Sequence, residues 1–147
     1  MTIKLSSLRA DLEKERKGTW QTALSVIPDP DVQFLVSSIH LPAYTSARNM
    51  LLQRLARIHK SNPPDEAIMT GVGGLFAEHL LHDWKGLAND DGSPVPFSKE
   101  LALKLLTDPA NRDLIRAVEQ AAGEAGRIDV DFVEDEVKNS GKPSARV

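Results

Sequence analysis

The chain contains no cysteine, and this absence excludes several kinds of chemistry. Disulfides, thiolate zinc sites and thiol nucleophiles all require cysteine, so none of them is available to this protein. Aromatic residues are also scarce, at 5% of the chain. We therefore expect a core built mainly from aliphatic side chains.

Long hydrophobic runs are missing as well. No apolar stretch approaches the roughly 20 residues of a membrane span, and residues 1–18 lack the apolar centre of a signal peptide. The hydrophobic content of 41% and the length of 147 residues fit one folded domain. We expect a cytoplasmic protein that makes no membrane contact.

Charge is present but unevenly distributed. Residues 1–60 carry nine Lys/Arg and five Asp/Glu, whereas residues 61–147 carry nine and sixteen, so the halves have net charges of +4 and −7 that sum to −3. This asymmetry favours a charged protein partner. The basic half has no dense Lys/Arg patch interleaved with aromatics, so we do not expect nucleic-acid binding.

The first third of the chain predicts a short helix or docked arm followed by a β-hairpin. Leu5, Leu8 and Leu12 recur at helical spacing. The strand-like runs TWQTALSVI and VQFLVSSI follow, separated by the turn sequence PDPD, which predicts an antiparallel hairpin over about 19–40. Two strands alone are marginal in water, so one face of this hairpin must pack on the helices that follow.

The remaining chain has the periodicity of helices, predicted over about 44–61, 65–85, 98–106 and 109–125. Gly86 suits the left-handed position after the second helix. Ser98 suits the N-cap of the third, and Asp108-Pro109 suits the start of the fourth.

Three glycines, Gly71, Gly73 and Gly74, fall inside the second predicted helix. Each costs up to about 1 kcal/mol relative to alanine in a helix interior. We therefore expect them to permit close helix approach or a bend. The surrounding TGVGGLF lacks the spacing of a Walker loop or a dinucleotide fingerprint, so we do not expect phosphate binding there.

Together these elements predict an α+β, mostly α fold, in which an N-terminal hairpin packs on a bundle of about four helices. We expect a single domain over residues 1–126. Residues 127–147 carry five acids between Asp129 and Glu136 and end in Ser, Gly, Pro and Lys. That composition predicts a mobile acidic tail.

Two patterns invite a metal site, and both fail on spacing. Setting Gly92 at position six of a calcium loop places Leu87 at position one and Ser98 at position twelve, where carboxylates are required. His79 and His82 could share a metal on one helix, but no nearby segment offers the third protein ligand that zinc needs. We interpret Asp90, Asp91 and Gly92 as turn formers, and expect no metal and no cofactor.

An enzyme is also poorly supported. No strand-Ser-turn signature accompanies a serine nucleophile, and the acids cluster only in the predicted tail. Trp20, Tyr44, Trp84 and Phe97 are better explained as core or interface anchors. We therefore expect a non-catalytic protein.

The order of several landmarks adds a family resemblance. KLSSLRADLEKERKGTW precedes a hairpin ending in FLVSSIHLPAY, and LLHDWKGLANDDGSPVPFSKELALKLLTDPANRDLI follows an arginine-bearing helix. This order resembles the tail assembly chaperones of long-tailed, non-contractile bacteriophages over roughly residues 4–126. The residues that carry the signature are Trp20, Trp84, Gly86, Gly92, Pro94, Pro96, Phe97, Asp108 and Pro109.

The resemblance implies a phage or prophage chaperone in the host cytoplasm that binds and solubilises the tape measure protein and helps to recruit tail tube subunits. It leaves the oligomeric state open. The ending VKNSGK is similar to family members in which a programmed frameshift near this point makes a longer fusion.

Contact with a partner would involve the exposed parts of two helix faces, for which helix-in-groove recognition is a model. The candidate partner-binding residues are Tyr44, Leu51, Leu55, Ile58, Leu114, Ile115 and Val118. The same stripes can equally be core. The alternative function is a structural head-tail connector or tail-completion protein, which would form closed rings and remain in finished particles.

Overall fold

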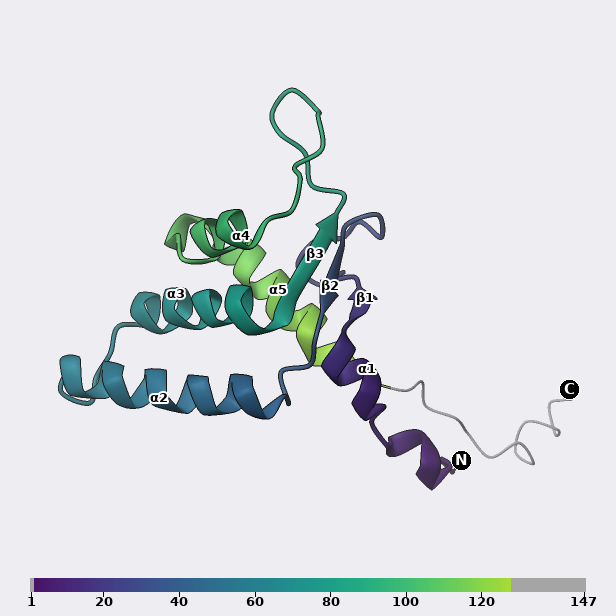
Figure 1. Cartoon of the computed structure of the whole chain (residues 1–147), viewed down its shortest axis with the longest axis horizontal. Helices are drawn as coiled ribbons and strands as arrows, with labels where there is room; N and C mark the ends of the chain where they lie inside the picture. Colours follow the sequence, from purple (N-terminus) through teal and green to yellow (C-terminus); the bar gives the residue numbers. More distant parts are fainter. Residues whose placement is uncertain (1, 128–147) are drawn as a thin grey trace, which may run out of the picture. The chain divides into compact units, whose positions relative to one another are not determined.

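The computed structural model describes residues 2–127 (Figure 1). The chain divides into two units, and Leu12–Gly126 forms the larger one, which holds the hydrophobic core. The N-terminal residues up to Asp11 belong to the other unit, where a 3₁₀ turn spans Leu5–Leu8 and the Ser7 hydroxyl donates to the Lys4 carbonyl. The predicted tail from Ile128 onward lies outside the described residues.

Three short antiparallel strands form one sheet in the order β1-β2-β3. The strands are β1 (Thr19–Gln21), β2 (Gln33–Val36) and β3 (Leu81–Lys85). Trp20 pairs with Leu35 across the first two strands, and Phe34 pairs with Trp84 across the last two. The predicted hairpin is therefore confirmed, although its strands are shorter than expected because the backbone turns after Ala23, whose carbonyl accepts two N–H groups.

The helix predicted over 65–85 is wrong in its C-terminal part. The α-helix α3 ends at Leu75, a π turn (η2) covers Phe76–Leu80, and the chain then becomes β3. Apolar spacing alone is compatible with either structure here, but β2 needs a second partner strand, and Leu80 and Leu81 are both fully buried. Tertiary pairing thus overrides the helical periodicity.

The helix-to-strand change leaves backbone carbonyls without helical partners, and the Lys99 ammonium donates to three carbonyls of this segment. Its ammonium donates to the Ala77 and Leu81 carbonyls, each at 3.0 Å. A cation at the end of a helix also interacts favourably with the helix dipole. Lys99 therefore ties the start of the next helix to the end of η2.

Three further helices follow the predictions closely: α2 (Pro42–Ile58), α4 (Lys99–Leu106) and α5 (Arg112–Glu124), the last preceded by a 3₁₀ turn, η3 (Pro109–Asn111). The helix α3 (Asp65–Leu75) is shorter than predicted, and a short helix, α1, spans Leu12–Lys17. Both predicted N-caps are confirmed. Ser98 Oγ accepts the Leu101 N–H at 3.0 Å, and the Asp108 carboxylate accepts the Ala110 N–H at 2.9 Å.

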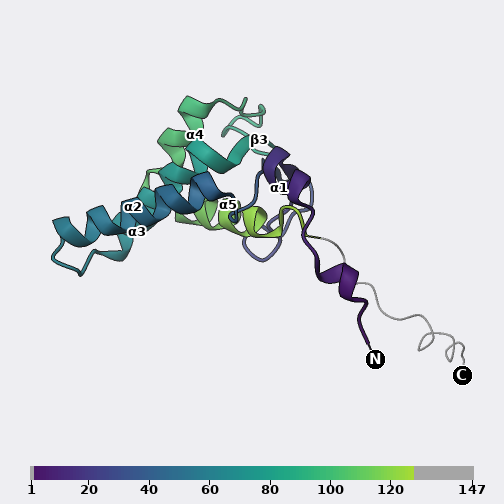
Figure 2. The same cartoon turned by 60° about the horizontal axis from the view of Figure 1, so that its bottom comes forward.

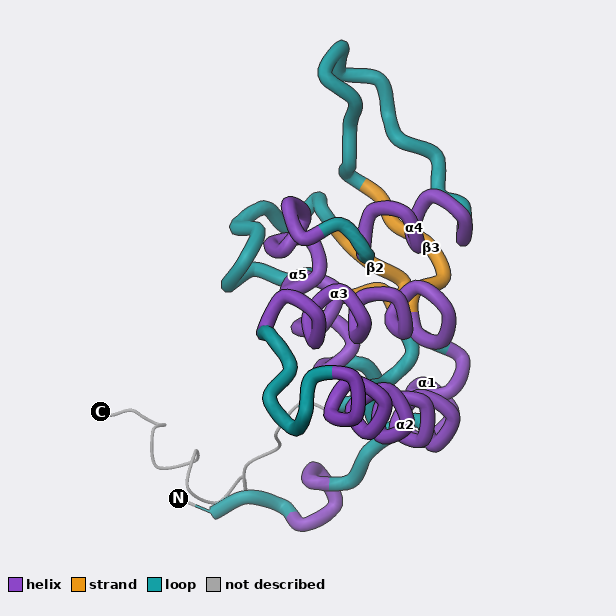
Figure 3. The backbone as a smooth tube through the Cα atoms, turned by 90° about the vertical axis from the view of Figure 1, so that its left-hand side faces the viewer, coloured by secondary structure: helices purple, strands orange, loops and turns teal. Residues whose placement is uncertain are grey.

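In the larger unit, α2 and α3 lie side by side, and α5 packs on the sheet (Figures 1 and 2). The connection from β3 to α4 extends away from these helices, as the tube view also shows (Figure 3). The largest fully buried side chains include Phe34, Val36, Phe76, Leu80, Leu81, Leu106 and Val118. Within residues 2–127, no helix has the length and apolar character that crossing a membrane would require.

The glycines of α3 confirm the expectation of close packing. A Cβ atom built on Gly73 would lie 2.0 Å from the Leu106 carbonyl oxygen at the end of α4. Gly86 has the expected positive φ of 89°, but it follows a strand rather than a helix. The predicted helix cap at Gly86 is therefore wrong, and the residue instead allows the backbone to pass close to Asp31.

Candidate functional site

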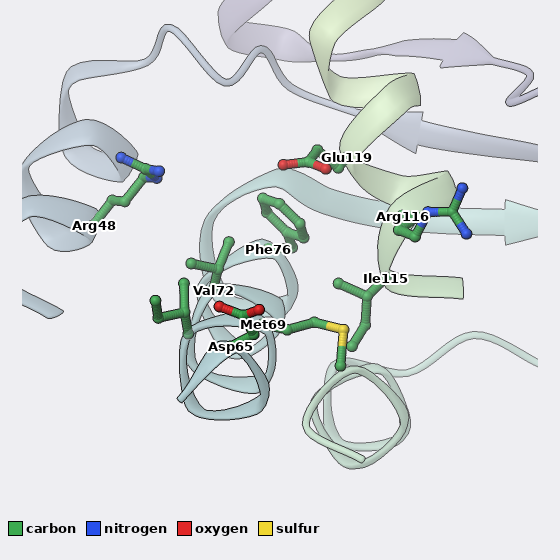
Figure 4. Close-up of a pocket in the computed structure, with 9 residues that line it drawn as sticks. Arg48, Asp65, Met69, Val72, Phe76, Ile115, Arg116 and Glu119 are labelled. Atoms are coloured by element: carbon green, nitrogen blue, oxygen red, sulfur yellow. The ribbon is translucent and has the colours of Figure 1, made fainter. Parts of the chain in front are cut away.

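A cavity of about 280 Å³ opens where α2, α3 and α5 meet (Figure 4). We call it the α2–α3–α5 cavity. Its lining comprises Arg48, Asp65, Ile68, Met69, Val72, Phe76, Ile115, Arg116 and Glu119. Small-molecule sites usually measure about 300–1,000 Å³, so the volume of this cavity lies at the lower end of that range.

The floor of the α2–α3–α5 cavity is apolar because one face of α3 points into it. Phe76 is buried and stacks on Tyr44 of α2, with ring centroids 5.7 Å apart. Val72 is also buried, and Met69 faces Ile115 of α5 across the opening (Figure 4). Met69 remains partly exposed, and its flexible side chain can adapt to different partners.

Charged side chains of both signs surround this floor. Arg48 comes from α2, Asp65 begins α3, and Arg116 and Glu119 belong to α5. Arg116 is held by Asp113 at 3.0 Å. Burial raises the pKa of Tyr44, the positive charge and hydrogen bond of Arg48 act to lower this pKa, and the carboxylate of Glu119 adds to its rise.

A second hollow of about 330 Å³ lies between α2 and α3, which we call the α2–α3 groove. Its lining comprises Ala47, Met50, Leu51, Arg54, Gly71, Gly74, Leu75, Glu78 and His79. The two hollows share no lining residue, although both border α2 and α3. Together they make α2 and α3 a candidate surface for partner contact.

The candidate partner-binding residues divide between core and surface. Tyr44, Leu51, Leu55, Ile115 and Val118 are buried in the core, Leu114 is half-buried, and Ile58 is 63% exposed. Ile115 lines the α2–α3–α5 cavity and Leu51 lines the α2–α3 groove. Partner binding by this set stays a prediction, and most of its members already have packing partners within the chain.

The signature residues lie mainly around the connection between β3 and α4. Trp84 is buried, donates its indole N–H to the Val95 carbonyl at 2.8 Å, and meets Phe97 edge to face. Trp20 is instead 38% exposed, with the Lys85 ammonium 4.1 Å from its ring centre. Gly86, Pro94 and Pro96 belong to the same connection, and Asp108 caps the turn that Pro109 begins.

The acidic turn within this connection is held by local hydrogen bonds. The Asp91 carboxylate accepts the Ser93 N–H and hydroxyl, which lowers the pKa of Asp91, and Gly92 adopts a φ of 88°. The prediction that these residues form a turn is confirmed. Within residues 2–127, no three His, Asp or Glu side chains are grouped closely enough to hold a metal ion.

His79 and His82 do not share a helix, contrary to the sequence prediction. His79 is in η2 and lines the α2–α3 groove, whereas His82 is in β3. His82 Nε2 lies 2.7 Å from Ser37 Oγ, and that hydroxyl also donates to the Arg16 carbonyl. Because the hydroxyl proton of Ser37 is donated to the Arg16 carbonyl, the His82 imidazole acts as the donor to Ser37 Oγ. A histidine that activates a serine nucleophile would instead accept the hydroxyl proton.

Thermal stability should fall from pH 7.5 to pH 5.5, in part because of His82. Burial lowers the pKa of His82, and the nearby Lys99 ammonium lowers it further. His82 therefore takes up a proton more readily in the unfolded chain than in the folded one. Stability is lost as the pH falls from about 6.5, the ordinary pKa of histidine, toward the lower pKa of His82 in the folded protein. Melting of wild type and His82→Gln at both pH values measures this. The control His59→Gln should keep the wild-type difference, and an unchanged difference in His82→Gln would contradict the assignment.

Sequence reasoning named apolar faces of α2 and α5 but selected no residue of α3, and it missed the charged residues around the cavity. Arg48, Asp65 and Glu119 were not selected, because nothing in their local spacing indicates a shared site. Lys99 was also missed, although its position directly after the Ser98 cap placed it at a helix start. Only the packing of α3 against α2 and α5 brings these groups together.

Comparison with known proteins gives one family match. A family model described as YdaY prophage protein matches residues 39–139, which is more than half of the chain. The matched segment includes α2, α3, β3, α4 and α5, and therefore both hollows. No curated protein matches the chain, and no solved structure matches it.

Proposed function

The chain belongs to the YdaY prophage protein family, and on this premise we propose that it is a tail assembly chaperone of a prophage. In this role it is non-catalytic and works in the cytoplasm of the bacterial host. It binds the tape measure protein, keeps it soluble and helps to recruit tail tube subunits. The resemblance carried by the segment from Asp83 to Pro109 supports this role, and so does the prophage origin of the family.

The observation that carries the proposal is the α2–α3–α5 cavity. Its apolar floor within a ring of both charge signs has the character of a groove that accepts the apolar face of a helix. A tape measure protein is long and helical, so it presents many such faces. Modest affinity at each cavity is then sufficient, because many chaperone copies along one client supply avidity and still allow displacement by tube subunits.

The direct test is co-expression with the tape measure protein of the same prophage. We expect the tape measure protein to move from the insoluble to the soluble fraction, and to co-purify with a tagged copy of this chain. A tape measure protein that is equally soluble with and without the chain, and that does not co-purify, contradicts the proposal. Closed rings of the chain retained in finished particles would instead indicate a head-tail connector.

A charge placed in the cavity should weaken this complex. Met69→Glu puts a carboxylate on the apolar floor, where a bound helix would leave it without water, so we expect client binding to fall at least about tenfold. The matched control is Leu24→Glu, which adds the same charge at a side chain that is 51% exposed in the β1–β2 connection. The measurement is client recovered per copy of tagged chain, with thermal melting to verify that both variants are folded. Equal recovery from both variants would exclude the cavity as the binding site.

A further inference from the structure

The α2–α3 groove has the dimensions and lining of a second helix-docking surface. On the α2 side, Ala47, Met50, Leu51 and Arg54 recur at i, i+3, i+4 and i+7, so this wall is two helical turns long. The opposite wall begins at Gly71 in α3 and continues into the π turn η2. Two turns of a partner helix present two or three apolar side chains on one face.

The floor of the α2–α3 groove is low because two of its residues have no side chain. Gly71 and Gly74 are one turn apart in α3, and Leu51 packs so close to Gly71 that a Cβ atom there would lie 3.0 Å from it. Met50 on the α2 wall is 70% exposed. An exposed apolar side chain thus borders a glycine floor, an arrangement that lets a partner helix approach closely.

The positive charge of α2 favours a partner that carries negative charge. The helix contains three arginines and no acidic residue. Arg54 lines the groove, and among residues 2–127 no carboxylate forms an ion pair with it. On the facing wall, Glu78 already lies beside Lys99, whose ammonium approaches the Glu78 carbonyl at 3.5 Å. Arg54 therefore offers the groove a positive charge that no carboxylate of residues 2–127 pairs with.

We propose that the α2–α3 groove binds an acidic amphipathic helix of the client, with apolar side chains over Gly71 and Gly74 and a carboxylate paired with Arg54. This inference rests on the proposed chaperone function, because it assigns a second client contact beside the α2–α3–α5 cavity. Two hollows on one helix pair let a single chaperone hold two helical segments of one chain. Simultaneous contact raises the overall affinity through effective concentration, without requiring either contact to be tight.

The test compares two charge reversals on the same helix while the chain is co-expressed with the tape measure protein. Arg54→Glu reverses the charge in the groove, and Arg57→Glu makes the same change at an exposed position one turn further along α2, outside the groove lining. We expect client recovery to fall at least about fivefold for Arg54→Glu, close to wild type for Arg57→Glu, and close to wild type for the charge-conserving Arg54→Lys. Met50→Ala, which removes an exposed apolar side chain from the α2 wall of the groove, should also reduce client recovery.

The outcomes separate this inference from the proposed function. If the wild-type chain recovers no tape measure protein, the chaperone function fails, and the groove assignment fails with it. If the wild type recovers the client and the two charge reversals behave alike, the groove assignment alone is overturned. Loss of self-association in Arg54→Glu, with client recovery unchanged, would assign the groove to a second copy of this chain and would also overturn it.

Discussion

Replacing Gly73 with alanine is expected to lower the free energy of unfolding by about 3 kcal/mol or more, at the upper end of the range for overpacked sites. The added Cβ would lie 2.0 Å from the Leu106 carbonyl oxygen and 3.1 Å from its carbon. Both atoms belong to backbone, so no side chain can rotate away. Either α3 or the end of α4 must move, although Leu106 is fully buried and tightly packed.

Gly123 in α5 provides the matched control. A Cβ built there meets nothing within 4 Å, so Gly123→Ala should leave the packing unchanged. It should stabilise the protein by up to about 0.5–1 kcal/mol through helix propensity. Denaturant unfolding followed by circular dichroism measures both changes. If Gly73→Ala were as stable as the wild type, the close approach of α3 to the end of α4 would be disproved.

The Gly73→Ala variant should also disturb the proposed client binding, because α3 lines both hollows. The helix carries Val72 into the α2–α3–α5 cavity and Gly74 into the α2–α3 groove. A shift of α3 away from α4 therefore displaces both binding surfaces together. A folded fraction that still recovered the tape measure protein fully would show that the client contacts another face.

Replacing Gly86 with alanine is expected to cost about 3 kcal/mol, by adding backbone strain to a steric clash. Gly86 has a φ of 89°, where residues with a Cβ are unfavourable by about 1–2 kcal/mol. Its Cβ would also lie 2.5 Å from the Asp31 carbonyl oxygen and 2.9 Å from Val32 Cα. The turn between β1 and β2 would have to separate from the end of β3.

A variant at Gly92 separates the cost of backbone strain from the cost of the steric clash. Its φ is 88°, nearly equal to that of Gly86, but a Cβ there meets nothing within 4 Å. Gly92→Ala should therefore cost only the conformational share, about 1–2 kcal/mol. The difference between the two variants in thermal or denaturant unfolding measures the contact with Asp31. Equal losses would show that this contact contributes nothing.

Local sequence signals predicted the helices well where the caps and periodicity agreed. Ser98 and Asp108 are caps whose side chains bond the first free N–H groups of their elements, and such bonds depend only on neighbouring residues. The prediction failed from Leu81 to Lys85, where the residues after the π turn form a strand instead of a helix. The local spacing there does not show that β2 requires a partner from 45 residues further along the chain.

The candidate site was predictable only in part, for a similar reason. The apolar stripes of α2 and α5 are visible in the sequence, but the stripes do not reveal which of their members stay accessible. Tyr44 and Val118 looked equivalent to Ile58, yet the first two are buried while Ile58 is 63% exposed. The exposure of a helical residue depends on which neighbours pack around it, and these come from distant segments.

The sequence by itself determined the class of this protein: a cysteine-free, mostly helical α+β chain with a hairpin, defined helix caps and the landmarks of a phage family. These features follow from composition, period and short-range hydrogen bonds. The tertiary structure alone decided that residues of α2, α3 and α5 line one cavity. It also decided that two glycines of α3 form the floor of the α2–α3 groove. Such spaces arise from the distances between helix axes, and these depend on packing across the whole core.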